Sequence, residues 1–283
     1  MQSQLPNGVA RETDPHGLER LRITTPAAEA VVYFQGAHVT HYQSRGQAPV
    51  LFMSARSRFA AGQPIRGGVP VIFPWFGPHP FDPNAPAHGF ARTTAWSLGD
   101  VRRSGEAVTI TLVMGSAKSS VRLRYAVTIG AALDLALTVQ NQDARALQFQ
   151  EALHTYLAVS DVGRVSIKGL SGRDYVDKVD GMKRKTQRGA LRITGETDRV
   201  YLDTSDTVTV DDPGMNRRIL VSKEGSSSTV VWNPWVEKAV KMPDFGDDEW
   251  TRMLCVETAN VADNAVTLAP GATHVMRAMV RVE

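Results

Sequence analysis

Apolar and polar residues alternate along much of this chain, and this period of two constrains the fold more than any other feature. Side chains at alternate positions of a β-strand point to opposite faces of a sheet, so each alternating segment is predicted to be a strand. Clear alternation occurs in residues 108–113, 121–125, 133–139, 165–168 and 208–210, with a looser version at 275–282. Long amphipathic helix patterns are absent. Many short strands bounded by turn residues are typical of an all-β sandwich or barrel.

The length and composition favour one large domain. The 283 residues are 42% apolar, which is enough for a sizeable buried core. No linker rich in Pro, Gly or Ser divides the chain into blocks of different composition. The Pro-rich stretch at 78–86 is predicted to be a loop over a pocket. The sequence therefore predicts a single domain over residues 1–283.

Charge and cysteine content narrow the possible partners and compartment. The formal net charge is +3, and the basic residues are scattered apart from 183–185, which is predicted to be a solvated loop rather than a nucleic-acid patch. The single cysteine, Cys255, excludes an intrachain disulfide and suits a reducing compartment. No secretory signal or transmembrane run is recognised. We expect a cytoplasmic monomer without nucleic-acid or membrane partners.

Residues 64–92 combine basic side chains with glycines, prolines and aromatics, a mixture that core strands do not need. Gly67 and Gly68 permit a positive φ or a close approach to a ligand, and three prolines stiffen the path. Arg66 and Arg92 carry planar guanidinium forks that suit phosphate or carboxylate. The segment therefore predicts a rigid pocket that presents cations to an anion; the alternative is that both arginines form structural ion pairs.

The histidines give no sign of a metal site. His16, His79 and His274 are expected at the surface. His38 and His41 are three residues apart, which in a strand places them on opposite faces. No H-E-x-x-H, C-x-x-C or acidic metal cluster occurs in the sequence. We expect neither a catalytic metal nor a cofactor.

Two further groups could transfer protons, although the pattern alone leaves their roles open. His154 lies in the strand-like run 149–156, where a hydrogen-bonded core histidine and a proton donor are both reasonable. Glu257 ends an apolar run, as a strand-end surface residue or a buried functional group would. Asp247 and Asp248 are predicted to lie in a solvated turn.

These segments, taken in order, resemble one known family. R-G-G-V-P from Arg66 and H-G-F-A-R from His88 are followed by L-H-T-Y around His154, V-W-N-P-W at 231–235 and C-V-E ending at Glu257. The chain is similar to the hexose-6-phosphate mutarotases, or glucose-6-phosphate 1-epimerases, of the aldose 1-epimerase superfamily. The resemblance extends from residue 36 to residue 271.

The resemblance implies a galactose mutarotase-like fold, a large antiparallel β-super-sandwich with its site in a cleft on one sheet face. It also implies an isomerase that interconverts the α and β anomers of a hexose 6-phosphate, with glucose 6-phosphate as the expected substrate. Glu257 would be the general base and His154 the general acid for opening the pyranose ring. The expected substrate-binding residues are Arg66, His88, Arg92 and Asp198.

Two alternatives remain open at this point. The chain could be an aldose 1-epimerase for an unphosphorylated sugar, or a non-catalytic sugar-phosphate binding module. Two departures from the family pattern bear on substrate choice: Ala87 stands where some members have glutamine, and Thr258-Ala259-Asn260 follows the glutamate where many have Pro-Gly. Four aromatic residues could pack on a sugar or belong to the core, namely Trp75, Phe76, Trp232 and Trp235.

Overall fold

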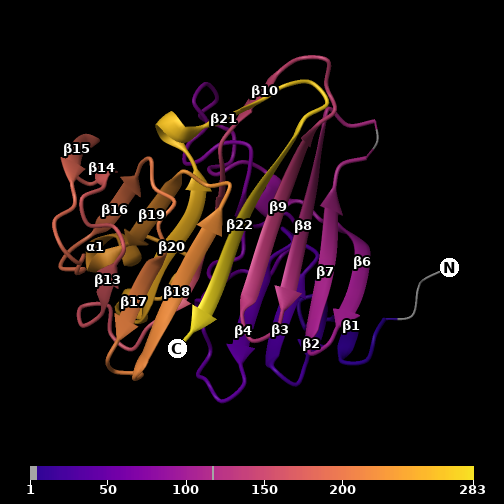
Figure 1. Cartoon of the computed structure of the whole chain (residues 1–283), viewed down its shortest axis with the longest axis horizontal. Helices are drawn as coiled ribbons and strands as arrows, with labels where there is room; N and C mark the ends of the chain where they lie inside the picture. Colours follow the sequence, from indigo (N-terminus) through magenta and orange to yellow (C-terminus); the bar gives the residue numbers. More distant parts are fainter. Residues whose placement is uncertain (1–4, 117) are drawn as a thin grey trace.

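The computed structural model describes residues 5–116 and 118–283, and two eight-stranded antiparallel sheets dominate it. The first sheet contains, in spatial order, β13 (Ser166–Lys168), β17 (Val208–Asp212), β18 (Arg217–Glu224), β22 (Thr273–Val282), β9 (Leu133–Asn141), β8 (Val121–Ile129), β7 (Ala107–Met114) and β6 (Ser97–Ser104). Its long strands cross the molecule side by side from β17 to β7 (Figure 1).

The second sheet will matter most for the site. Its strands, in order, are β15 (Lys183–Thr186), β14 (Asp174–Asp177), β16 (Thr197–Tyr201), β19 (Ser228–Asn233), β20 (Met253–Asn260), β11 (Glu151–Leu153) and β5 (Val71–Ile72), and β12 (Tyr156–Ala158) also pairs with β20. Figure 1 shows β16, β19 and β20 together at the left of the molecule.

Smaller elements complete the fold. A four-stranded sheet contains β1 (Val9–Thr13), β2 (Glu19–Thr24), β3 (Ala28–Tyr33) and β4 (Val39–Ser44), and β10 (Leu147–Phe149) pairs with β21 (Val266–Leu268). The helical segments are short: α1 (Trp235–Ala239), η1 (Ala91–Thr93), η2 (Glu249–Arg252) and η3 (Ala262–Asn264).

One cluster of buried apolar side chains joins all three larger sheets. It includes Leu21 of β2, Leu137 of β9, Val256 of β20 and Val280 of β22. Burying apolar surface is the main favourable contribution to folding, so this shared cluster holds the layers together. It supports the prediction of one domain over residues 1–283, which stays a prediction.

The predicted all-β antiparallel architecture is confirmed. Each alternating segment of the sequence lies in a strand, namely β7, β8, β9, β13, β17 and β22. The prediction of a loop at 183–185 is wrong, because these residues form most of the edge strand β15. Its side chains are nonetheless mostly exposed, and charged residues on an edge strand discourage pairing with another chain.

Strands β19 and β20 give no alternating signal in the sequence because every one of their residues is buried. One face of β20 contributes Leu254 and Val256 to the main core. The other contributes Met253 and Cys255 to a second cluster, under η2 and α1. A strand covered on both faces needs apolar residues on both, so its period is lost.

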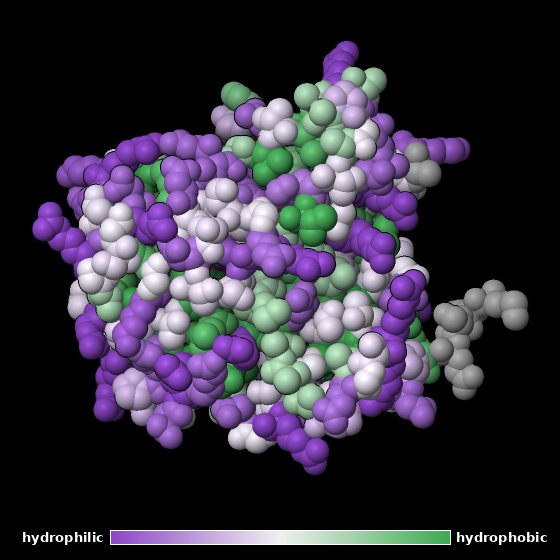
Figure 2. Space-filling model, viewed as in Figure 1, coloured by the Kyte–Doolittle hydropathy of each residue, from purple (hydrophilic) through white to green (hydrophobic). Residues whose placement is uncertain are grey.

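The outer surface is mostly polar. Figure 2 shows hydrophilic residues over most of one face, with small separate apolar areas between them. Among residues 5–116 and 118–283, no helix is long and apolar enough to cross a membrane.

Candidate active site

His154 and Glu257 contact each other directly. The Nε2 atom of His154 lies 3.3 Å from Oε1 of Glu257, and their side chains are only 9% and 1% exposed. His154 directly follows β11, whereas Glu257 lies in β20, with which β11 pairs. A histidine and a carboxylate at this separation can exchange a proton with each other or with a molecule that touches both.

The register of the second sheet collects further side chains on the same face as Glu257. Asp198, Trp232, Cys255 and Tyr156 stand opposite one another across β16, β19, β20 and β12. Cys255 precedes Glu257 by two positions, so all of these side chains share one face. The His154 ring stacks on Tyr156 at a centroid distance of 4.8 Å and meets Trp232 edge-on at 6.0 Å.

Gly68 lets the R-G-G-V-P segment lie close to β4 on one side while its backbone contacts the L-H-T-Y segment on the other. Gly68 has a φ of +61°, and a Cβ there would lie 2.2 Å from the carbonyl oxygen of Val39. The backbone carbonyls of Gly68 and Pro70 accept hydrogen bonds from Tyr156 and His154. The R-G-G-V-P segment therefore lies directly against the L-H-T-Y segment, which brings Arg66 to the site.

Arg66 is already engaged within the protein. Its guanidinium pairs with Asp244 at 3.1 Å and donates to the hydroxyl of Tyr156 at 3.0 Å. Burial works against its charge, but the charges of Tyr156 and Asp244 raise the pKa of Arg66. The alternative of a structural ion pair therefore applies to Arg66, although its side chain still reaches the site.

Arg92, at η1, has fewer partners. Its Nη2 donates to the backbone carbonyl of Ala87 at 2.7 Å, and its Nε is buried with no hydrogen-bond partner among the described residues. Burial, and then the charge of Arg66, lower the pKa of Arg92 to about 10, so it remains a cation at neutral pH. This contact involves only the backbone of residue 87, so it does not depend on whether alanine or glutamine stands there.

His88 completes this side of the site. Its ring meets that of His154 edge-on at 5.9 Å and that of Phe76 at 4.8 Å. The backbone N–H of Gly77 donates to Nδ1 of His88 at 3.2 Å, which leaves Nε2 to carry the hydrogen of the neutral ring. Burial, with Arg92 and Lys178, lowers the pKa of His88 to about 3, so His88 can act as a neutral donor.

Burial also determines how the central pair holds its proton. It lowers the pKa of His154, with His88 and Arg92 acting in the same direction. Burial and the nearby Asp198 raise the pKa of Glu257. The charged forms of both groups are thus disfavoured, so burial favours a single proton of the pair on Glu257. Within residues 5–116 and 118–283, Nδ1 of His154 and Oε2 of Glu257 are buried without hydrogen-bond partners, so both could bind a ligand.

Asp198 lies beside this pair, where the family pattern predicts it. It is 8% exposed, and its Oδ2 lies 3.1 Å from Nζ of Lys178. Burial raises the pKa of Asp198, and Lys178 opposes that effect. The six predicted site residues, His154, Glu257, Arg66, His88, Arg92 and Asp198, therefore gather at one face of the second sheet.

The other sequence candidates divide between the site and other parts of the molecule. Trp232 lies in the site and Phe76 at its border, whereas Trp75 donates to the carbonyl of Pro86 and Trp235 packs on Trp250. Asp247 and Asp248 are exposed, as predicted. The surface assignment of His274 is wrong, because its Nε2 lies 2.8 Å from the fully buried Glu151.

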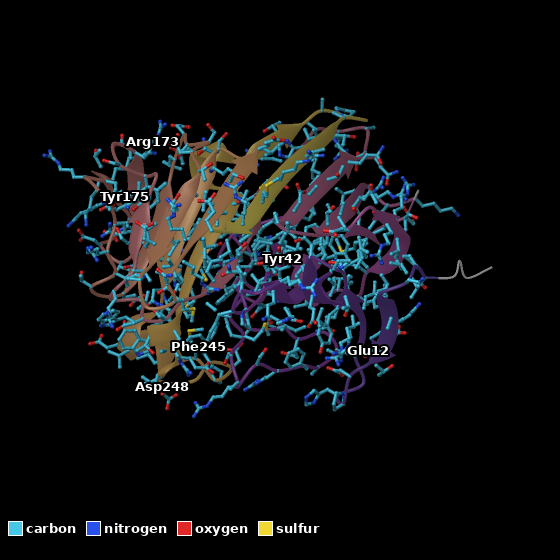
Figure 3. The ribbon with its side chains drawn as sticks, turned by 60° about the horizontal axis from the view of Figure 1, so that its bottom comes forward. Glu12, Tyr42, Arg173, Tyr175, Phe245 and Asp248 are labelled. Atoms are coloured by element: carbon cyan, nitrogen blue, oxygen red, sulfur yellow. The ribbon has the colours of Figure 1, made fainter. Side chains whose placement is uncertain are left out.

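Three residues at the site had no role assigned from the sequence. Tyr156 could have been found, because it follows His154 by two positions in a strand-like run and so shares its face. Asp244 and Lys178 carry no local signal, since they come from loops that reach the site only through the tertiary fold. Figure 3 shows Phe245, next to Asp244, on the same corner as Asp248, and Phe245 packs in one cluster with Tyr156 and Trp232.

Over the described part of the chain, no group of three or more His, Cys, Asp or Glu is arranged to hold a metal ion. The expectation of an enzyme without a metal or cofactor stays a prediction.

Comparisons with known proteins agree with this geometry. A family model described as aldose 1-epimerase matches residues 19–278. A protein from Cenchrus ciliaris named "Putative glucose-6-phosphate 1-epimerase" is 35% identical over 288 residues, covering 95% of this chain and 86% of that protein. A protein of the same name from Escherichia coli K12 is 32% identical, with 87% and 84% covered.

A solved structure is similar over almost the whole chain. The crystal structure of a "putative mutarotase" from Salmonella typhimurium has a TM-score of 0.91 at 28% identity, covering 99% of this chain and 95% of that one. The fold is therefore that of the galactose mutarotase-like β-sandwiches, and the protein is an isomerase of sugar anomers. The chain belongs to the aldose 1-epimerase family. This membership sets aside the alternative of a non-catalytic binding module.

Proposed function

We propose that this protein interconverts the α and β anomers of a hexose 6-phosphate, with glucose 6-phosphate as the preferred substrate. The observation that carries the proposal is the contact between His154 and Glu257 at 3.3 Å, next to two arginines on one sheet face. The names of the relatives from Cenchrus ciliaris and Escherichia coli support the same substrate.

Proton transfer by the pair accounts for the reaction. Ring opening requires loss of the proton from the C1 hydroxyl and protonation of the ring oxygen, while the bond from C1 to that oxygen breaks. In this proposal the Glu257 carboxylate takes the first proton and protonated His154 donates the second. The pair then holds its proton on Glu257, which is the state that burial favours.

Ring closure reverses both transfers after rotation about the C1–C2 bond. The protonated Glu257 returns a proton to the aldehyde oxygen, and neutral His154 removes one from the attacking hydroxyl. The pair thus ends as it began, and no covalent intermediate is needed. Because the two side chains already touch, we expect the sugar to lie over both of them rather than between them.

The second part of the proposal concerns the phosphate. Arg92 has a buried Nε without a partner, which a phosphate oxygen would satisfy. Arg66 could contribute a further donor while it keeps Asp244. We expect His88 and Asp198 to hold sugar hydroxyls, since a neutral Nε2–H donates and a carboxylate accepts.

One observation favours an aldose 1-epimerase for unphosphorylated sugars. The ion pair between Arg66 and Asp244 neutralises one of the two cations before any ligand binds. A neutral hexose would then meet one unpaired cation instead of two. The two functions differ in whether the site discriminates between a phosphate ester and the free sugar.

Exchange NMR of glucose 6-phosphate and glucose distinguishes these functions. The wild type should strongly prefer the phosphate ester. Arg92→Ala should lose about 10- to 150-fold in kcat/KM for the ester, mainly through KM, because one charge-assisted contact is worth about 1.5–3 kcal/mol. For glucose the variant should change little.

The exposed Arg45 provides a matched control, since Arg45→Ala removes the same charge from the turn that follows β4. It should leave both substrates unaffected. Equal activity of the wild type on glucose and glucose 6-phosphate would disprove the phosphate specificity and leave the neutral-sugar epimerase.

A further inference from the structure

Lys178 reaches the site from the turn between β14 and β15. Its backbone N–H donates to the carbonyl of Asp198 at 2.9 Å. Its Nζ lies 3.1 Å from Oδ2 of Asp198 and 5.3 Å from the centre of the Phe76 ring. The ammonium is therefore held between a buried carboxylate and an aromatic face, two environments that each favour a cation.

The turn that carries Lys178 is itself well anchored. Asp177 accepts hydrogen bonds from the backbone N–H groups of Val179 and Asp180, and it pairs with Lys185 at 2.8 Å. These contacts fix the backbone on both sides of Lys178. Its side chain is directed to the site by this anchored turn rather than by a local sequence motif.

The site needs such a cation because it holds two buried carboxylates. Asp198 and Glu257 are 8% and 1% exposed and repel each other. Two buried carboxylates that share a site do not readily ionise together without a compensating charge. Arg66 is paired with Asp244, and the hydrogen bond of Arg92 goes to a backbone carbonyl.

We propose that Lys178 is a positioning residue for the anomerisation reaction. By pairing with the carboxylate of Asp198, it keeps the neighbouring Glu257 in the charged form that removes the sugar proton. This inference rests on the proposed function, specifically on Glu257 as the base.

The charged and titratable groups around Asp198 and Glu257 come from several elements. They are His154 and Tyr156 beside β11, Cys255 on β20, Asp244 and the motif residues Arg66, His88 and Arg92, the turn residue Lys178, and the pair of Glu196 and Lys238 next to Asp198. In this set, the ammonium of Lys178 is the cation in ion-pair contact with Asp198.

Three variants test the role of the charge. Lys178→Met keeps the length and the apolar stem, and Lys178→Arg keeps the charge. Lys183→Met removes a lysine from the same hairpin, where Lys183 is exposed and pairs with Asp180. For each variant, kcat/KM for glucose 6-phosphate is measured from about pH 5 to pH 9 by exchange NMR.

The sign of the effect follows from the chemistry. Without Lys178, Glu257 keeps its proton to higher pH, so the acidic limb of the plot of kcat/KM against pH moves to higher pH. We expect Lys178→Met to lose about tenfold in kcat/KM on the acidic side, with most of the activity recovered at high pH. Lys178→Arg should recover most of the loss, and Lys183→Met should match the wild type.

Carbon-13 NMR of the labelled carboxyl groups provides a readout that does not depend on activity. Glu257→Gln and Asp198→Asn assign the signals, and Lys178→Met should move the coupled titration of the two carboxyls to higher pH. An unmoved titration overturns the inference. A higher KM for the phosphate ester with an unmoved acidic limb also overturns it, because Lys178 would then contact the phosphate.

The two proposals fail in different ways. If the wild type catalyses no exchange of glucose 6-phosphate, the proposed function is wrong. The carboxyl titration still tests whether Lys178 affects the protonation of Asp198 and Glu257. If the wild type is active and Lys178→Met behaves as the wild type in both measurements, only the inference about Lys178 is wrong.

Discussion

At the scale of single residues, burial gives this site its chemistry. With their usual pKa values of about 6.5 and about 4.3, His154 would be charged in part of the molecules at neutral pH and Glu257 would be ionised. In the protein, burial lowers the pKa of one and raises that of the other, so both charged forms are disfavoured. Burial therefore shifts the shared proton from the histidine toward the carboxylate, which is its position after ring opening in the proposed reaction.

The residue whose replacement tests this view most directly is Glu257. Glu257→Gln keeps the size and removes the base, so the rate of anomer exchange should fall by about 10²- to 10⁴-fold, with the far-UV spectrum unchanged. Exchange NMR measures the rate. Asp247→Asn serves as the control, because Asp247 is exposed and pairs with Arg56. Near-normal exchange in the Glu257 variant would mean that another group is the base.

At the scale of elements, close backbone contacts place the arginines against the strands. The segment that contains His88 lies beside Phe73, because Phe73 and Gly89 form a β-bridge. Gly89 has a φ of +70°, and a Cβ there would lie 1.9 Å from the carbonyl oxygen of Phe73. This glycine is required by a contact between two segments and not by its own turn alone.

A pair of glycine variants separates the cost of a positive φ from the cost of a close contact between two backbone segments. Gly77 has a φ of +77°, but a Cβ there would meet nothing within 4 Å. Gly77→Ala should therefore cost only the left-handed backbone conformation, about 1–2 kcal/mol. Gly89→Ala should cost about 1–3 kcal/mol more, because the backbones must also separate. Urea unfolding measures both, and equal losses would show that the close contact is unimportant.

At the scale of the whole molecule, a polar contact joins the two large sheets next to the site. His274 of β22 pairs with Glu151 of β11 at 2.8 Å, and Asn260 of β20 donates to the same carboxylate oxygen at 2.9 Å. Asn260 is one of the residues that depart from the family pattern. The asparagine at this position therefore takes part in the contact between the sheets, three residues beyond Glu257.

This contact predicts a pH dependence of stability. The hydrogen bond that His274 donates to Glu151 raises the pKa of His274, while burial opposes it. Protonated His274 therefore stabilises the folded state fully below the pKa of an unfolded histidine, about 6.5, and the stabilisation is lost as pH rises through the folded value. His274→Gln should lose more stability at pH 6 than at pH 8.5.

The expected difference is on the order of 1 kcal/mol, because His274 is half-buried and water screens the pair. Urea unfolding at the two pH values measures it. His79→Gln, in an exposed loop, is the control and should change stability equally at both. A His274 variant whose loss is the same at pH 6 and pH 8.5 would show that the charge of His274 does not contribute.

Much of the fold could be predicted because local patterns determine it. Strands such as β8 and β9 have one face in the core and one nearer to water, so their residues alternate, as in Leu133 to Val139. The two strands that build the site, β19 and β20, carry no such pattern, since both of their faces are covered. Their position became clear only from the packing of the whole chain.

The sequence by itself determined the all-β class, the family resemblance and the six candidate site residues, because each depends on residue types at fixed spacings. The tertiary structure decided which charges meet. Lys178 lies beside Asp198, Asp244 pairs with Arg66, and His274 reaches Glu151, although 20 to 178 positions separate the members of each pair. Charge interactions depend on distance and burial in space, and no local pattern of the chain records either of them.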